Sequence, residues 1–381
     1  MFKRSQSHQR LADADVVFIY RTLLGRSPGE GEIARQRESA GWRELIEMVI
    51  ASPEYRGRTD AAPTLPLPPA VNVWHPDLAE HGLAVGTRSS DGSVVVGRDG
   101  WLFLIGGTNA VLAQYSPDFE LSDDWGQAWA EVIEDREAGA RSIGAELAMV
   151  VVPDKLSVLR EFLPAGLGEL SNQSPASRLH AAHPKLRYPV AELAGCGDHG
   201  FLRTDTHLSL AGNAVLGEVV LADLGIDQRS AGEVRRSARS KIAMSGDLGT
   251  RFSPAVVEVA EVETSFGQAT VVEDNRSQVA ALGRHVGTRR IWRNPQAPDR
   301  RTAVVFGDSY AFAEPHYPGL CWHLAQRFGQ VHFVWVPFGW DLEYARSAEA
   351  SVVVCETAER FVPRPPAAIS VAEIVRSAVI P

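Results

Sequence analysis

Cysteine is scarce in this sequence, and the chain has neither a basic stripe nor a long apolar run. The three cysteines, Cys196, Cys321 and Cys355, are an odd number without Cys-x-x-Cys spacing. That pattern argues against a disulfide framework and against a zinc site. The formal net charge is −9, and no cluster of Lys and Arg is large enough to form a basic face. Nucleic acid is therefore a poor candidate partner.

Long apolar segments are also absent. No segment reaches the roughly 20 apolar residues that span a bilayer. The first 14 residues contain no apolar stretch of signal-peptide length, and the first apolar cluster, residues 16–20, is followed by Arg21. We therefore expect no membrane span and a cytoplasmic location.

The length of 381 residues allows two domains. Apolar residues recur at helical spacing within residues 16–24 and 45–50, which predicts a small all-α module over residues 1–58. Residues 59–80 are predicted to be a linker because they are rich in proline, with Pro63, Pro66, Pro68 and Pro69. The second domain then covers residues 81–381.

The pattern of the second domain predicts an α/β fold. Two apolar runs, Val94–Val96 and Trp101–Leu104, flank Asp99-Gly100 and indicate a β-hairpin. Unbroken strand-like runs separated by helical patterns indicate a mostly parallel sheet flanked by helices; these runs are residues 148–152, 303–306, 331–336 and 351–354. Apolar residues alternate with other residues in parts of the stretch 230–300. This alternation predicts antiparallel strands that depart from the parallel sheet or form an insertion.

One strand ends in a candidate nucleophile. Residues 303–306 lead directly into Gly307-Asp308-Ser309, which places Ser309 at the carboxyl edge of the sheet, where open α/β folds bind ligands. Gly307 permits a tight turn that a side chain would obstruct. A serine that only caps the next helix is the structural alternative.

A serine needs a base to remove its proton, and His207 is the best candidate among the eleven histidines. It stands in a polar cluster before a helical stretch, residues 209–224, and Asp205 lies two residues before it. That spacing lets the carboxylate orient one imidazole nitrogen while the other faces the serine. The same pair could be half of a metal site, but no companion ligand is evident at suitable spacing, so we expect no metal.

The order of these residues excludes the α/β-hydrolase arrangement, which needs an acid and then a histidine after the serine. The only aspartate after Ser309 is Asp341, and no histidine follows it.

The motifs together resemble the AlgX/AlgJ-like SGNH acetyltransferases, in which Asp-Thr-His precedes Gly-Asp-Ser. The resemblance covers about residues 90–365 and includes four further stretches: Gly97–Phe103, Val151–Lys155, Gly246–Leu248, and Val353–Glu356 with Glu359–Phe361. Leu208 departs from the pattern, because the family commonly has Trp there. Residues 10–58 resemble the DUF4214 helical module, through Tyr20–Arg26 and Ser52–Tyr55.

The resemblance implies an SGNH-like fold and transfer of an acetyl group onto a bacterial polysaccharide or glycan precursor through an acyl-serine. Carried over by position, Ser309 is the nucleophile, His207 the base and Asp205 its orienting acid. No cofactor is implied beyond an acetyl donor, which a partner protein could supply. The resembled proteins work outside the cytoplasmic membrane, in contrast to the location that the N-terminus predicts.

Four further residues are candidate substrate-binding residues. The Ser309 backbone N–H is the expected first donor to an oxyanion. Asn109, in the loop 106–109, and Tyr310 are candidates for the second donor, and Asn109 is alternatively a turn residue. Lys155 could position substrate or be a solvated lysine at a strand end. Trp340 could stack on a sugar ring or belong to the core, and Trp292 and Trp335 are weaker candidates of the same kind. Arg360 is expected to pair with Glu356 or Glu359.

Two alternative functions stay open. A carbohydrate esterase would use the same triad, because water can replace the sugar hydroxyl at the acyl-enzyme. A catalytically silent glycan-binding or assembly protein would retain the fold without the chemistry.

Overall fold

The computed structural model forms two compact units, residues 1–78 with 257–259, and residues 79–256 with 260–381. It describes residues 83–366 except 169, 198–199, 227–238, 254, 264–266, 282 and 314–317, and before them residues 16, 20, 28–36, 45, 48–49 and 51–54. Of the predicted N-terminal module, it includes helix α2 (Glu30–Gln36) and buried Val16, Tyr20 and Leu45. The predicted linker and most of the DUF4214-like stretch lie outside the described residues.

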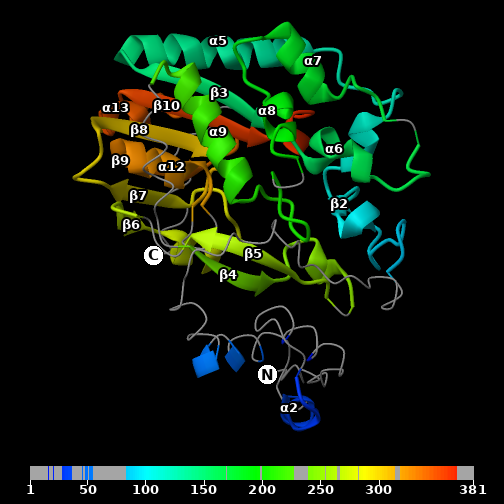
Figure 1. Ribbon diagram of the computed structural model, residues 1–381. Helices are drawn as coiled ribbons and strands as arrows, with labels where there is room; N and C mark the ends of the chain where they lie inside the picture. Colours follow the sequence, from blue (N-terminus) through cyan, green and yellow to red (C-terminus); the bar gives the residue numbers. More distant parts are fainter. Residues whose placement is uncertain are drawn as a thin grey trace, which may run out of the picture. The chain divides into compact units, whose positions relative to one another are not determined.

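The larger unit is built on a six-stranded sheet with the strand order β3-β10-β8-β9-β7-β6 (Figure 1). The first four strands run parallel to one another, whereas β7 is antiparallel to β9 and β6 is antiparallel to β7. Their bounds are β3 Glu146–Val152, β6 Thr270–Asp274, β7 Arg289–Arg293, β8 Asp299–Gly307, β9 Phe328–Trp335 and β10 Val352–Ala358. The predicted α/β fold class, with an antiparallel excursion at one side, is confirmed.

The central strands are apolar on both faces because helices cover both faces. All seven residues of β10 are buried, as expected for a strand inside a parallel sheet. One core cluster packs under α5 (Trp125–Ile143), α7 (Pro175–Ala182) and α13 (Leu342–Ser347). The other packs under α6 (Lys155–Val158), α8 (Val190–Ala194), α9 (Leu210–Asp223) and α12 (Leu320–Arg327).

Two small sheets lie outside the main one. The predicted hairpin is confirmed, since β1 (Val94–Val96) pairs antiparallel with β2 (Leu102–Leu104). Its connection passes through Asp99 and Gly100, both at positive φ, of 49° and 68°, a conformation that Asp and Gly tolerate better than most residues. A second two-stranded sheet joins β4 (Arg239–Met244) and β5 (Glu258–Glu263).

The parallel strands β3, β10 and β8 all end at one edge of the sheet. The segments that follow them, beginning at Pro153, Glu359 and Asp308, therefore meet there. This is the edge at which open parallel sheets carry their ligand sites.

Candidate active site

The loop after β8 is held by buried hydrogen bonds around Asp308. The Asp308 carboxylate accepts the N–H of Tyr310 at 2.9 Å and the N–H of Ala358 at 2.7 Å. The Asp308 N–H in turn donates to Glu356 Oε2 at 2.9 Å. Ser309 lies inside this fixed turn and is half-buried. The loop thus presents the serine from a rigid support.

A side chain at Gly307 would be obstructed, as predicted. The φ of Gly307 is not positive, so any residue could adopt the backbone conformation. A Cβ atom at this position would lie 2.5 Å from Glu356 Oε2 and 2.8 Å from the Ala311 Cβ. The close approach of β10, rather than backbone strain, therefore requires glycine before Asp308.

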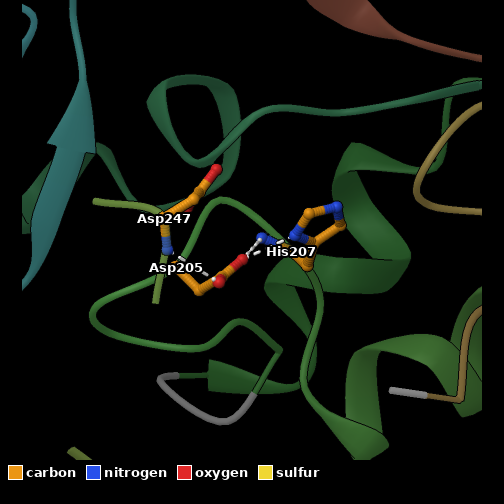
Figure 2. A group of neighbouring side chains, drawn as sticks. All are labelled: Asp205, His207 and Asp247. Atoms are coloured by element: carbon orange, nitrogen blue, oxygen red, sulfur yellow. Dashed lines mark hydrogen bonds and ion pairs between the residues drawn. The ribbon is translucent and has the colours of Figure 1, made fainter. Parts of the chain in front are cut away.

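Asp205 and His207 form a hydrogen-bonded pair on the loop before α9 (Figure 2). Asp205 Oδ1 accepts the backbone N–H of His207 at 2.9 Å and lies 2.5 Å from His207 Nδ1. Asp205 Oδ2 accepts the N–H of Asp247 at 3.0 Å. Because the carboxylate can only accept, Nδ1 carries a proton and Nε2 is the basic nitrogen of the neutral ring. This is the tautomer that a general base needs.

Burial and pairing shift both pKa values in this pair. Burial acts to raise the pKa of Asp205, but hydrogen bonds from His207 and its charge outweigh burial, so the pKa lies below its usual value. Burial acts to lower the pKa of His207, and the hydrogen bond and charge of Asp205 reverse this, so the pKa is raised. The aspartate therefore stays ionised and stabilises the imidazolium.

Asp247 supports the loop that carries Asp205 and His207, which the sequence alone did not indicate. Its two carboxylate oxygens accept the backbone N–H and the hydroxyl of Thr206, each at 2.7 Å. The preceding Gly246 has no room for a side chain, because a Cβ there would lie 2.4 Å from the Asp205 Cβ. The Gly246–Leu248 motif was noticed only as a family signature. Its position against the Asp205 loop gives it a physical purpose, which is to hold that loop in shape.

Asp205, His207 and Asp247 also offer three ligand atoms within 4.8 Å of one another, as a metal site would. Asp247 is a companion carboxylate that ligand spacing in the sequence did not reveal, because it is distant along the chain and close in space. Both Asp247 oxygens are engaged by Thr206, and Asp205 Oδ1 is engaged by His207 Nδ1. This donor set fits a proton-transfer pair better than a coordination shell.

Tyr310 joins the serine loop to the histidine loop. Its hydroxyl donates to the Thr206 carbonyl oxygen at 2.7 Å, and its ring centroid lies 5.1 Å from that of His207. His207 and Ser309 consequently line one small cavity, together with Leu208, Asn213 and Phe312 among others. These two described side chains share the cavity without a hydrogen bond between them, and catalytic hydrogen bonds commonly tighten only when a substrate binds.

The three candidate oxyanion donors, the Ser309 N–H, Tyr310 and Asn109, lie in different surroundings. Within the described residues, the Ser309 N–H donates to no acceptor, so it is available to a developing oxyanion. Tyr310 is buried, with its hydroxyl committed to Thr206, which corrects its assignment as an oxyanion donor. Asn109 lies in a half-buried turn, and its carbonyl oxygen accepts the Gln114 side chain at 2.9 Å.

Two predicted substrate contacts are corrected. The Lys155 ammonium is buried and donates to the carbonyl oxygens of Leu102 and Arg203, at 3.0 Å each, so it is neither solvated nor directed at a substrate. The Trp340 ring packs in the core against Gly139 of α5 and is 8% exposed. Of the weaker candidates, Trp292 is fully buried and Trp335 is half-buried.

Arg360 pairs with Asp154 and not with Glu356 or Glu359, the two predicted partners. Its Nη1 lies 2.5 Å from Asp154 Oδ1 and 3.4 Å from the Tyr310 hydroxyl. Glu359 instead accepts the N–H of Asp154 at 2.9 Å. These buried groups connect the ends of β3 and β10 to the serine loop.

No helix among the described residues is long and apolar enough to cross a membrane.

A family model and several solved structures are similar to this chain. A family model described as an SGNH hydrolase-like domain, acetyltransferase AlgX, matches residues 94–310, more than half of the chain. The structure of Bacillus cereus PatB1 with a sulfonyl adduct is 13% identical with a TM-score of 0.50, and the match covers 71% of this chain and 95% of PatB1. This likeness shows the fold.

Two other solved structures are similar to the chain. The O-acetyltransferase domain of Pseudomonas putida AlgJ is 19% identical with a TM-score of 0.45, over 75% of this chain and 99% of that domain. Pseudomonas aeruginosa AlgX is 13% identical with a TM-score of 0.40, over 71% of this chain and 67% of AlgX. No curated protein matches the sequence. On the family match, the chain belongs to the family of SGNH hydrolase-like acetyltransferase AlgX domains.

Proposed function

We propose that this acetyltransferase-family chain moves an acetyl group onto a glycan hydroxyl through a covalent acyl-serine at Ser309. The observation that carries the proposal is the meeting of two distant loops. Ser309 and His207 line one cavity, and Asp205 holds the far nitrogen of the imidazole at 2.5 Å. Family membership supports the acetyl group as the transferred unit.

The first half-reaction acylates the serine. His207 Nε2 takes the Ser309 hydroxyl proton as Oγ attacks the carbonyl carbon of an acetyl ester or thioester donor. The Ser309 N–H stabilises the tetrahedral oxyanion, and loss of one such donor costs on the order of 3 kcal/mol in barrier. The imidazolium then returns the proton to the leaving group, and acetyl-Ser309 remains.

The second half-reaction delivers the acetyl group. His207 takes the proton of a glycan hydroxyl as the sugar oxygen attacks the acetyl carbonyl, and the proton passes to Ser309 Oγ when the ester to the enzyme breaks. Asp205 stabilises the imidazolium in both halves and stays ionised. A separate donor must supply the acetyl group in each cycle, and a partner protein is our candidate for that role.

Incubation with a chromogenic acetyl ester, with and without an oligosaccharide, tests the proposal. We expect chromophore release, acetylated oligosaccharide, and a Ser309 peptide heavier by one acetyl group in mass spectrometry. The variant Ser309→Ala should lose all three signals, while Ser347→Ala, which changes an exposed serine on α13, should keep them. Ester hydrolysis without sugar acetylation would indicate an esterase. Unchanged turnover in Ser309→Ala would refute the acyl-serine, and absence of turnover above background in the wild type would favour the silent binding protein.

A further inference from the structure

Asn213 adds a polar side chain to the cavity that Ser309 and His207 share. It lies in the first turns of α9 and is 5% exposed. Apart from the proposed catalytic pair, the rest of the described wall is apolar or, at Tyr310, has its hydroxyl committed to Thr206; it consists of Leu208, Tyr310, Phe312 and Gly319. Among the described residues of the wall, Asn213 is therefore the polar side chain that the acetyl transfer leaves without a role.

Two main-chain carbonyl groups fix the orientation of the Asn213 amide. Its Nδ2 donates to the carbonyl oxygens of Leu208 and Ser209, at 3.1 Å each. An exchange of the amide nitrogen and oxygen would set three acceptors against one another, so these contacts identify which atom is the nitrogen. Because the amide group is planar, Oδ1 is directed away from both carbonyl oxygens.

Asn213 Oδ1 is buried and has no hydrogen-bond partner among the described residues. A buried acceptor without a donor costs free energy, because it has lost its hydrogen bonds to water. Buried polar atoms are seldom left in this state unless a catalytic role or a bound molecule explains them. Since Asn213 lines the cavity of the proposed catalytic pair, a reactant in that cavity is the donor that would complete Oδ1.

We propose that Asn213 positions a water molecule for attack on acetyl-Ser309 and so sets how much of the acetyl group is lost to hydrolysis. The inference rests on the proposed acyl-serine. Water has two O–H groups, of which one donates to His207 Nε2 and the other to Asn213 Oδ1. An alcohol has one O–H group, which it must give to the base, so it leaves Asn213 Oδ1 without a donor. The asparagine therefore favours water over a competing hydroxyl.

The hydrolytic step uses the same base as the transfer. The water oxygen attacks the acetyl carbonyl carbon while one of its protons passes to His207 Nε2. The other proton stays on the oxygen, hydrogen-bonded to Asn213 Oδ1, and becomes the hydroxyl proton of acetic acid. The bond between the carbonyl carbon and Ser309 Oγ then breaks, and the imidazolium returns its proton to Oγ. Asn213 exchanges no proton and acts only by orienting the nucleophile.

Competition between water and a simple alcohol for acetyl-Ser309 tests the inference. The full chain is mixed with para-nitrophenyl acetate in buffer containing methanol. The initial burst of nitrophenolate measures acetylation of Ser309, and acetate and methyl acetate measure its two fates. Asn213→Leu removes the acceptor and keeps the branching of the side chain, so acetate formation should slow about tenfold. The burst and the rate of methyl acetate formation should be retained, so the ratio of methyl acetate to acetate should rise by the same factor.

A second variant separates the amide oxygen from the structural hydrogen bonds of Asn213. In Asn213→Ser, the hydroxyl can still donate to the Ser209 carbonyl oxygen, but the amide oxygen is gone. This variant should raise the ratio as Asn213→Leu does. The matched control is Asn294→Ser, which changes another buried asparagine, one that donates to the Ala325 carbonyl oxygen at 2.9 Å. It should keep the wild-type ratio. Thermal unfolding checks that all three variants fold.

The inference is overturned if both Asn213 variants keep the wild-type ratio. It is also overturned if acetylation, hydrolysis and methanolysis slow equally, because Asn213 would then have a structural role only. A rise in the ratio for Asn294→Ser that equals the rise for the Asn213 variants has the same consequence. Absence of acetyl-Ser309 in the wild type refutes the proposed function itself. Failure of the water-positioning role alone is recognised by acetyl-Ser309 that forms in every variant and divides between water and methanol as in the wild type.

Discussion

The hydroxyl of Tyr310 donates to the carbonyl oxygen of Thr206 across 104 positions of sequence, at 2.7 Å. The donor is the residue after the proposed nucleophile, and the acceptor is the residue before the proposed base. One buried hydrogen bond thus sets the relative position of the two loops. Burial also raises the pKa of Tyr310 well above its usual value, so the hydroxyl keeps its proton.

Tyr310→Phe should weaken this connection while leaving the core filled. We expect a loss of about 1 kcal/mol in the free energy of unfolding, because the Thr206 carbonyl loses its donor. We also expect kcat for the acetyl ester to fall as the His207 loop becomes less well positioned. Denaturant unfolding and steady-state kinetics measure the two effects. Tyr344→Phe, which removes a hydroxyl 2.9 Å from His332 in the other core cluster, is the matched control. An equal fall in kcat there would contradict the positioning role.

Asp205→Asn should abolish most activity and shift its pH dependence. The base works only when neutral, and the pKa of His207 is raised in the native protein, so activity should increase with pH through a pKa above 6.5. Without the carboxylate, the pKa of His207 falls and the rising limb moves to lower pH. By analogy with other triads, kcat should drop about ten-thousandfold. A pH–rate profile and the ¹H NMR titration of His207 provide the measurement. If the rising limb of the pH–rate profile does not shift in Asp205→Asn, a group other than His207 titrates.

Removal of metal ions should leave activity unchanged. The carboxylate oxygens of Asp205 and Asp247, and Nδ1 of His207, already hydrogen-bond within this group or to Thr206. Activity before and after dialysis against EDTA, with metal analysis of the dialysed protein, checks this. Loss of activity that zinc or another divalent ion restores would favour a metal site.

Gly246→Ala should damage the base loop. The added methyl would lie 2.4 Å from the Asp205 Cβ and 2.5 Å from the Thr204 carbonyl oxygen, an overlap that costs about 1–3 kcal/mol. We expect lower stability and lower kcat. Gly126→Ala, within α5 and with nothing within 4 Å of the new methyl, should gain roughly 0.5–1 kcal/mol through helix propensity. Equal destabilisation of both variants would contradict the steric argument.

Glu356→Gln should be tolerated, and it should flatten the pH dependence of stability. Burial, reinforced by the charge of Asp308, raises the pKa of Glu356 well above its usual value. The native state therefore binds a proton that the unfolded state releases, and stability falls as pH rises from the unfolded pKa through the native one. Glutamine has no such proton to lose. Chemical unfolding across pH 4 to 9 compares the two proteins, and parallel curves would show that Glu356 does not titrate in this range.

Local patterns along the chain were enough to predict the sheet, the opening hairpin and the residues of the proposed triad. A buried strand is a continuous run of apolar residues, and a helix repeats its apolar residues at the helical period. Both elements can therefore be recognised from residues that are close in sequence. Asp205 and His207 are two positions apart, and their pairing was predictable from spacing alone.

Contacts between distant segments were decided by the tertiary structure. Asp247 accepts a hydrogen bond from Thr206, and Arg360 pairs with Asp154. Trp340 packs against α5. In each case, packing brings together residues that are distant in sequence. A cavity lined by Arg160, His180 and Arg187 likewise forms only where three segments of the chain meet. Sequence shows which chemistry each side chain can perform, whereas the partner that satisfies a buried charge depends on which loops the sheet places side by side.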